Sequence, residues 1–448
     1  MTEAAERIID KLLARYRRDA VLLHRPYPPH NAPRTNSKFG GLPRLPEHHE
    51  WPRMPSGVPL HFLAQIDCAD IGHPSPLPDR GVLFFFGRSD DEQVWYADRP
   101  QEACRVLYVQ DAFALTPPRA APDDLPPIGG FYPPPFARPF LHRDQPGPNL
   151  YVEWPIQPLQ FDSWPDGSAV HEAISPPFDW GRLNPARLFG KPRFPAWVER
   201  AGEIEEIVEE YDEVLERKRD AEYYRATREP RPEQQWDGYS TAVALQLYGG
   251  DAAPDAFPQL WSHVDFFCRA LTTEIAAGRT GFDDPAATTS AAQEWIARAG
   301  GRPASDPVAD VDRADFRAWI ASLPKHPSFP FNGIVSSSIT EASAAVVRAF
   351  AGDPERASLI SRSSYDIMAP LFCGGSVFGV QFSQMLGHAP SAQEALSVND
   401  PTICLLSLST DGGLGWMFGD VGECTFWISP QDLKRRDFSH VWATIEGH

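Results

Sequence analysis

The chain has 448 residues, of which 42% are hydrophobic and 23% are charged, a composition typical of a globular protein with more than one domain. Its formal net charge of −19 argues against nonspecific binding to nucleic acid or to anionic membranes, and it is compatible with a basic protein partner. The 47 prolines, about twice the usual share, predict long extended loops.

Residues 1–160 are predicted to form a β-rich unit that follows a leading helix. Apolar residues recur at helical spacing through residues 3–23, which predicts a helix that ends before Pro26. Apolar runs after a proline-rich loop then predict strands at residues 60–67, 81–87 and 104–110. The unit therefore begins with a helix and continues as an antiparallel sheet.

Residues 161–194 are predicted to be a proline-rich linker, and residues 195–352 a mainly helical insertion. The insertion opens with a predicted long helix over residues 196–228. Residues 196–216 hold nine acidic residues and one arginine, so this segment is strongly acidic, with a net charge of −8.

Helix signals continue through the rest of the insertion. Apolar spacing predicts a helix from Leu260 to Ile275. Asp284 precedes a proline and predicts an N-cap with proline at the first helical position. Ser338 and Glu341 have capping-box spacing and predict the start of a helix that runs to Phe350.

Residues 353–448 return to β structure and are predicted to form a second β-rich unit that packs on the first. Its predicted strands are residues 376–382, 403–408, 416–418 and 425–428. The apolar strands near residues 402–409 and 422–428 repeat the spacing of those at 60–67 and 81–87. The predicted fold class is therefore α+β, with two pseudo-repeated antiparallel β units at the N- and C-terminal ends and a large, mainly helical insertion between them.

Two ordered motifs resemble a bacterial protein family. The first is the run from Ser37 to Pro43, followed by the apolar strand that ends at Asp67, and the second is the closing run from Trp416 to Ile428. Together they resemble the YwqG-like family, also described as domain of unknown function 1963. The resemblance covers about residues 1–160 and 360–448, and it implies an α+β protein with duplicated β units and no established activity.

A small-ligand site is one interpretation of the glycine-rich loop. Gly40 and Gly41 would let backbone N–H groups approach an anion, and Lys38 would add a positive charge. Gln65 and Asp67 interrupt the apolar strand that follows. The alternative is structural: a tight loop that needs positive φ, held in place by hydrogen bonds from Gln65 and Asp67.

A second group of candidate ligand-binding residues comprises His61, His388 and Asp420. These side chains would meet if the two β units faced each other across a cleft, and a histidine oriented by an aspartate can act as a general base. The alternative is that the histidines belong to the core. The sequence has none of the common catalytic motifs, so no catalytic residue is assigned.

No metal or cofactor is expected. His48-His49-Glu50 has the residue types of a metal site but not the i, i+4 spacing that places two imidazoles on one helix face. No two of the six cysteines have C-x-x-C spacing, and the first residues form neither a signal peptide nor a membrane helix. We therefore expect a cytoplasmic protein.

The leading hypothesis is a protein-binding module, immunity-like or scaffold in type, that uses an acidic surface. The docking element would be the acidic helix, through Glu205, Glu206, Glu209, Glu210 and Glu213. The alternative is an enzyme or sensor that binds a small anionic ligand between the two β units. A purely structural module stays open as a third possibility, and the sequence gives no oligomeric state.

Overall fold

Two antiparallel sheets form the centre of the molecule in the computed structural model. It describes residues 14, 16–72, 75–90, 99, 101–112, 116–129, 148–165, 217–229, 257–278, 281–324, 333–372, 382–389, 400–419 and 421–447. Sheet A has the order β11 (Trp442–Glu446), β10 (Glu423–Ile428), β9 (Ile403–Ser409), β8 (Gln384–Leu386), β1 (Arg18–His24) and β7 (Gln157–Ser163). Sheet B has the order β5 (Cys104–Val109), β4 (Val82–Gly87), β3 (His61–Asp67), β2 (Lys38–Phe39) and β6 (Trp154–Pro155).

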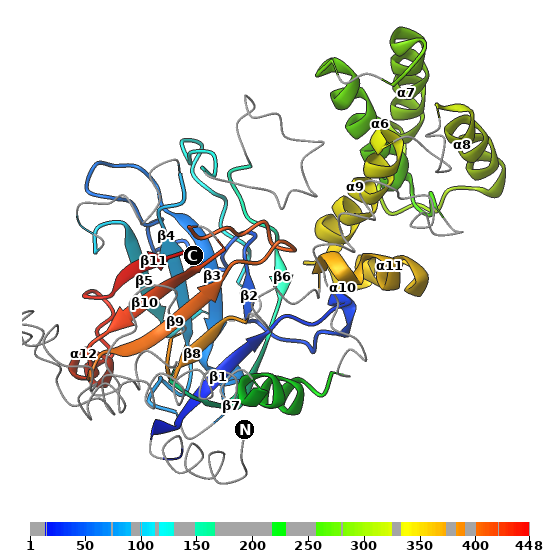
Figure 1. The fold of residues 1–448 in the computed structure, drawn as a ribbon. Helices are drawn as coiled ribbons and strands as arrows, with labels where there is room; N and C mark the ends of the chain where they lie inside the picture. The colour runs from blue at the N-terminus through cyan, green and yellow to red at the C-terminus, as the bar shows by residue number, and fades with distance from the viewer. Residues whose placement is uncertain are drawn as a thin grey trace, which may run out of the picture.

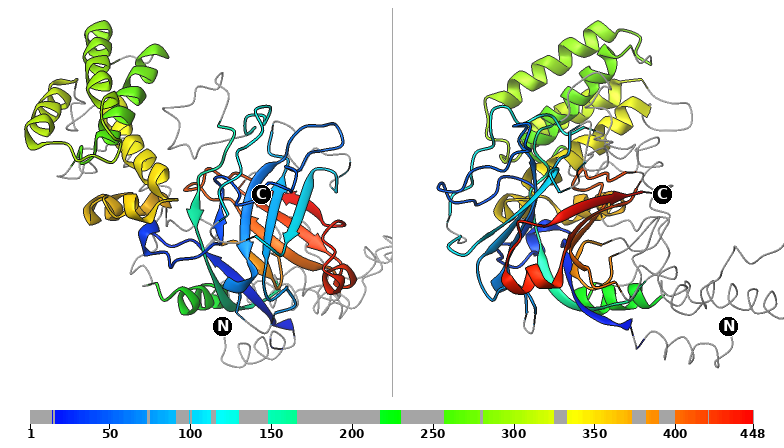
Figure 2. Two further views of the ribbon diagram at one scale, coloured as in Figure 1. Left: turned by 180° about the vertical axis from the view of Figure 1, so that it is seen from behind. Right: turned by 90° about the vertical axis from the view of Figure 1, so that its left-hand side faces the viewer.

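The two sheets pack face to face as a sandwich around one apolar core, and Figure 2 shows them as separate layers. Phe85 from sheet B meets Phe426 from sheet A edge to face, with ring centroids 5.4 Å apart. The outer face of sheet B is covered as well, because Phe84 and Phe86 pack against Trp51 and other apolar residues of the surrounding loops. Burial on both faces explains why β4 is a continuous apolar run rather than an alternating one.

Strand β1 corrects the prediction of a leading helix through residue 23. Residues 18–24 pair with β7 on one side and with β8 on the other, so they lie inside sheet A. Ala20, Val21, Leu22 and Leu23 are all buried there. Their run of apolar residues satisfied a helical pattern, but pairing with strands distant in sequence determines the local structure. Residues 3–13 and 15 of the predicted helix lie outside the described part of the chain.

Four described helices lie between residues 257 and 352 of the predicted insertion, and the two caps predicted there form with one exception. The helices are α6 (Trp261–Ala276), α7 (Pro285–Gly300), α8 (Asp310–Ser322) and α9 (Gly333–Phe350). The Asp284 side chain accepts a hydrogen bond from the backbone N–H of Ala287, which confirms the predicted N-cap. The exception is α9, which begins five residues before Ser338, so Ser338 and Glu341 are buried within it and do not cap it.

Helices α6, α7 and α8 and the first half of α9, which we call the helical arm, stand off from the sandwich (Figure 1). The arm has its own core, in which Phe267, Trp295 and Phe316 make edge-to-face contacts. The second half of α9 belongs to the sandwich core instead, through Val346, Val347 and Phe350. Helix α9 therefore connects the two regions.

Shorter elements complete the described fold. Helices α10 (Pro354–Ala357) and α11 (Arg362–Phe372) follow α9, and α12 (Pro430–Arg435) lies between β10 and β11. Single 3-10 turns occupy Pro29–Asn31 and Cys68–Asp70. The predicted strand at residues 416–418 is wrong, because Trp416 only closes a turn with Asp411 and places its ring in the core. Within the described ranges, no helix combines the length and apolarity needed to cross a membrane.

Candidate functional site

The Gly40-Gly41 loop is shaped by contacts with the protein's own backbone. Both glycines have positive φ, at 55° and 67°. The N–H of Gly40 donates to Leu63 O at 2.9 Å, and that of Gly41 donates to Tyr151 O at 3.0 Å. A Cβ at Gly40 would lie 2.1 Å from the carbonyl oxygen of Val152. These two N–H groups therefore stabilise the loop itself.

Lys38 is buried beside this loop with its charge already paired. Its Nζ lies 2.9 Å from Glu153 Oε2 and donates to Leu42 O at 2.7 Å. Burial lowers the pKa of the Lys38 ammonium, and the Glu153 carboxylate opposes that shift. The positive charge predicted for an anionic ligand is thus balanced within the protein.

Gln65 and Asp67 attach the same loop to β3. Gln65 Oε1 accepts from the Arg44 N–H at 2.9 Å, and its Nε2 donates to Asn36 O at 2.6 Å. Asp67 accepts from Asn36 Nδ2 at 3.1 Å and from the Ala69 N–H at 3.0 Å. The structure therefore brings Lys38, Gly40, Gly41, Gln65 and Asp67 into one hydrogen-bonded unit.

His61 lies in β3 of sheet B, whereas His388 follows β8 of sheet A, and the two contact different partners. Among the described residues, they share no hydrogen-bond partner. His61 Nε2 donates to Pro126 O at 2.9 Å, and His61 Nδ1 accepts from the Ser89 N–H. His388 Nε2 donates to Tyr16 O at 2.6 Å. The third residue of this predicted group, Asp420, lies outside the described residues.

Burial favours the neutral form of both imidazoles. It lowers the pKa of His61, and it lowers the pKa of His388 to about 4. Each imidazole is hydrogen-bonded to a backbone carbonyl, as is usual for a histidine of the core.

A depression of about 220 Å³ lies beside strands β1 and β8. Its lining is Asp19, Ala20, Val21, Ser75, Pro76, Gln160 and Leu386. None of the predicted ligand residues lines it.

A polar junction joins α9 to the sandwich, and sequence reasoning missed it. Arg25 Nε lies 2.6 Å from Asp411 Oδ2, and the Arg25 guanidinium stacks 4.5 Å from the ring centre of Trp154. Arg348 on α9 donates to the carbonyl oxygens of Gly412 and Gly413 in the turn that follows Asp411. Because these groups are far apart in the chain, no local spacing reveals them.

Glu341 is the buried acidic group of α9. Its side chain is 1% exposed, and Oε1 has no hydrogen-bond partner in the structure as described. Burial raises the pKa of the Glu341 carboxyl to about 8; Arg348 opposes this shift and the Glu274 carboxylate adds to it. The carboxyl is therefore largely protonated at neutral pH.

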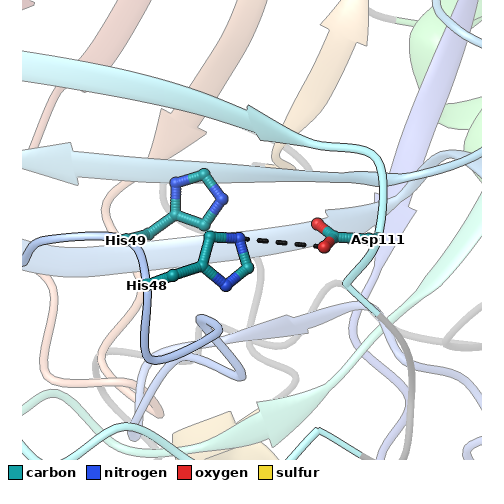
Figure 3. Close-up of side chains that lie close together, drawn as sticks. All are labelled: His48, His49 and Asp111. Atoms are coloured by element: carbon teal, nitrogen blue, oxygen red, sulfur yellow. Dashed lines mark ion pairs between the residues drawn. The ribbon is translucent and has the colours of Figure 1, made fainter.

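Two surface clusters combine imidazole and carboxylate groups, and Figure 3 shows the first of them. In the first, His48 Nε2 lies 3.7 Å from Asp111 Oδ2, and the rings of His48 and His49 are 4.4 Å apart. The second cluster comprises Asp432, Asp437 and His440. The sequence showed the two adjacent histidines, but Asp111 joins them only through the fold.

The predicted docking residues Glu205, Glu206, Glu209, Glu210 and Glu213 lie outside the described residues. Residues 217–227, the end of the same predicted helix, are helical. The docking element therefore stays a prediction.

Comparison with known protein families gives a match. A family model described as "Domain of unknown function (DUF1963)" matches residues 37–252 and 311–446, which together make up most of the chain. The interval between the two matched segments contains α6 and α7. No curated protein matches the sequence.

Proposed function

The chain belongs to the DUF1963 family, and we propose that it is a protein-binding module, immunity-like or scaffold in type, that acts in the cytoplasm and engages a basic partner through an acidic surface. The acidic charge of the chain carries this proposal, and the helical arm adds to its support. The arm stands off from the sandwich around a separate core, a form that suits contact with another macromolecule (Figure 1). The family model skips residues 253–310, which supports the view that α6 and α7 were added to a common sandwich.

Charge supports a basic partner. The net charge of −19 attracts a basic protein over distances of about a Debye length and speeds its association. Within the insertion, the most acidic segment is residues 196–216, which directly precedes the helix at residues 217–227. The proposed docking residues are therefore Glu205, Glu206, Glu209, Glu210 and Glu213.

The alternative, an enzyme or sensor for a small anionic ligand, has less support. Lys38 is paired with Glu153, and the N–H groups of Gly40 and Gly41 are bonded to backbone carbonyls. An anion at this loop would have to displace those contacts, and it would then be repelled by the unpaired Glu153 carboxylate.

The two β units are proposed to derive from one duplicated unit, with the helical insertion between them. Three observations support this. In the β3–β4 pair the register shifts at Leu63, and in the β9–β10 pair it shifts at Leu405. Gly40 and Gly41 after β2, and Leu386 and Gly387 around the end of β8, all have positive φ. Each of β2 and β8 also pairs with the first strand of its hairpin.

The decisive experiment compares two charge-reversal variants in parallel captures. One variant carries Lys at Glu205, Glu206, Glu209 and Glu210, and the matched control carries Lys at four exposed carboxylates of the sandwich, Glu47, Glu50, Asp79 and Asp123. The tagged wild type and both variants are used as baits in lysate of the native host at low and at high salt. We expect the wild type and the control to retain the same basic protein in stoichiometric amount at low salt, and the docking variant to lose it.

The association rate of the purified pair then quantifies the effect. At low salt we expect the docking variant to associate at least about tenfold more slowly than the control variant, because electrostatic steering acts mainly on the association rate. Equal capture by the two variants would contradict the docking surface. The absence of any stoichiometric partner would contradict the proposed function itself.

A further inference from the structure

We propose that His48, His49 and Asp111 form a binding site for a divalent transition-metal ion, for which Zn²⁺ is the best match. The site lies on the outer side of sheet B, where the loop before β3 meets the turn after β5 (Figure 3). It lies outside the arm, and it shares no residue with the proposed docking segment.

The ligand set suits this class of ion. Two imidazoles and one carboxylate offer one ligand atom each, and these atoms all lie within 4.8 Å of one another. Neutral imidazole and carboxylate are ordinary Zn²⁺ ligands, whereas Ca²⁺ and Mg²⁺ prefer oxygen atoms alone. Three protein ligands leave one position of a tetrahedral ion for water.

Small side-chain movements are enough to bring the three ligand atoms to the spacing of a tetrahedral metal site. Bonds of about 2.0–2.2 Å around a tetrahedral ion place its ligand atoms roughly 3.4 Å apart. The present separation of His48 Nε2 and Asp111 Oδ2, 3.7 Å, is already close to that. The side chains of His48 and Asp111 are 61% and 64% exposed, so rotation about their side-chain bonds is free to complete the geometry.

The fold holds the two loops together without an ion. Arg44 Nη1 donates to Thr116 O at 3.0 Å, and the Arg119 N–H donates to Pro43 O at 2.7 Å. These bonds tie the segment just before the histidines to the segment just after Asp111. Trp51 anchors the other end of the histidine loop, because its Nε1 donates to Leu60 O at 2.8 Å. The three ligands are therefore brought together by structure that is already stable, which limits the entropy lost on binding.

The second cluster supplies a matched control. Asp432 accepts from Ser429 Oγ at 2.7 Å at the start of α12, and Asp437 accepts from the Ser439 N–H at 3.1 Å. Its carboxylates are thus committed to local turns, and it contains a single imidazole, that of His440. His440→Ala should therefore leave the proposed site intact.

The test is a calorimetric titration with Zn²⁺ at pH 7.5, using full-length protein freed of its tag and treated with EDTA. The wild type should bind an ion with a dissociation constant in the micromolar range. The variant His48→Ala/His49→Ala should bind one ion fewer, Asp111→Asn should bind it about tenfold more weakly, and His440→Ala should match the wild type. Circular dichroism confirms that each variant is folded.

Thermal unfolding gives an independent readout, since an ion that bridges two loops of the folded state raises the melting temperature. Zn²⁺ should raise it for the wild type and for His440→Ala, and less for the double histidine variant. Equal stoichiometry and affinity in the wild type and the double variant would overturn the proposal. So would the absence of binding to the wild type, or loss of binding in His440→Ala.

Discussion

The sandwich and the helical arm bury the two halves of the same helix, α9, in different ways. The half inside the sandwich has two polar side chains, and both are hydrogen-bonded: Ser343 donates to Ile339 O, and Arg348 donates to the carbonyl oxygens of Gly412 and Gly413. The half inside the arm buries Ser336, Ser338 and Glu341, each with a side-chain oxygen that lacks a hydrogen-bond partner in the described structure. In the sandwich core the buried cation of α9, Arg348, is hydrogen-bonded. In the core of the arm the buried carboxyl of α9, Glu341, is kept neutral. We expect the arm to be the less stable and more pH-sensitive region.

The prediction with the largest expected effect asks whether the core of the sandwich and the core of the arm unfold separately. Phe426→Ala removes a fully buried ring that meets Phe85 between the sheets, and it should lower the free energy of unfolding by about 3–5 kcal/mol. The matched variant Phe316→Ala removes a fully buried ring from the arm. Hydrogen exchange is measured at increasing urea concentration. In Phe316→Ala the backbone amides of α6–α8 should begin to exchange while those of β3, β4, β9 and β10 stay protected from exchange. A uniform loss of protection in both variants would mean a single cooperative unit.

The second prediction concerns Glu341 and the pH dependence of the arm. Its folded pKa of about 8 lies above the ordinary value of 4.5, so the folded state holds a proton that the unfolded state has lost between these pH values. The stability of the arm should therefore fall as pH rises from about 4.5 to 8, by roughly 1.4 kcal/mol per unit at most. Glu341→Gln removes this dependence, and it should stabilise the protein by about 2–4 kcal/mol at pH 8 and by little at pH 4.

Thermal unfolding of the wild type and Glu341→Gln across pH 4–9 measures this difference. Glu294→Gln on the exposed side of α7 is the control, and its curve should follow that of the wild type. Parallel curves for the wild type and Glu341→Gln would show that Glu341 is ionised in the folded protein at neutral pH.

The third prediction weakens the polar junction between α9 and the rest of the sandwich. Asp411→Asn removes the charge that Arg25 contacts at 2.6 Å, while it keeps the oxygen that accepts from the Gly413 N–H. Both side chains of the pair are largely shielded from solvent, so we expect a loss of about 1–3 kcal/mol in urea unfolding. A double-mutant cycle with Arg25→Gln isolates the pair, and a coupling energy near zero would contradict this role.

The smallest expected effect is at the surface of the sandwich. Arg53 makes bonds of 2.7 Å and 2.9 Å to Asp124, but both side chains are open to solvent. Water and salt screen such a pair, so Arg53→Ala should leave the urea midpoint nearly unchanged. If Arg53→Ala lowered the free energy of unfolding as much as Asp411→Asn does, solvent exposure would not explain the difference expected between the Arg53–Asp124 and Arg25–Asp411 ion pairs.

Much of the fold could be predicted from local patterns. The apolar runs predicted β3, β4, β9 and β10, and Asp284 before proline predicted the start of α7. The resemblance read from the two terminal motifs is confirmed by the family match. Strand β1 was missed because its apolar residues also fit a helix, and only β7 and β8 decide between the two.

The candidate sites were harder to predict, since their members meet through the fold alone. The unit around Lys38 and Gln65 is local, and the sequence grouped its members correctly. His61 and His388 were grouped on the assumption of a cleft, yet their hydrogen-bond partners differ. Asp411 and Arg348 carry no spacing signal, and neither does Asp111 beside His48, because strands distant in sequence bring them together.

Strand β1 has a consequence for the order of events during synthesis. A ribosome releases β1 and β7 early, but β8, the neighbour on the other side of β1, follows only after the helical arm. At about 5–20 residues per second, the roughly 220 residues between β7 and β8 take about 10–45 s to make. During that interval one edge of β1 offers unpaired backbone groups to any other nascent chain. Protection by a chaperone therefore matters most while the chain is being translated, before the sheet can close.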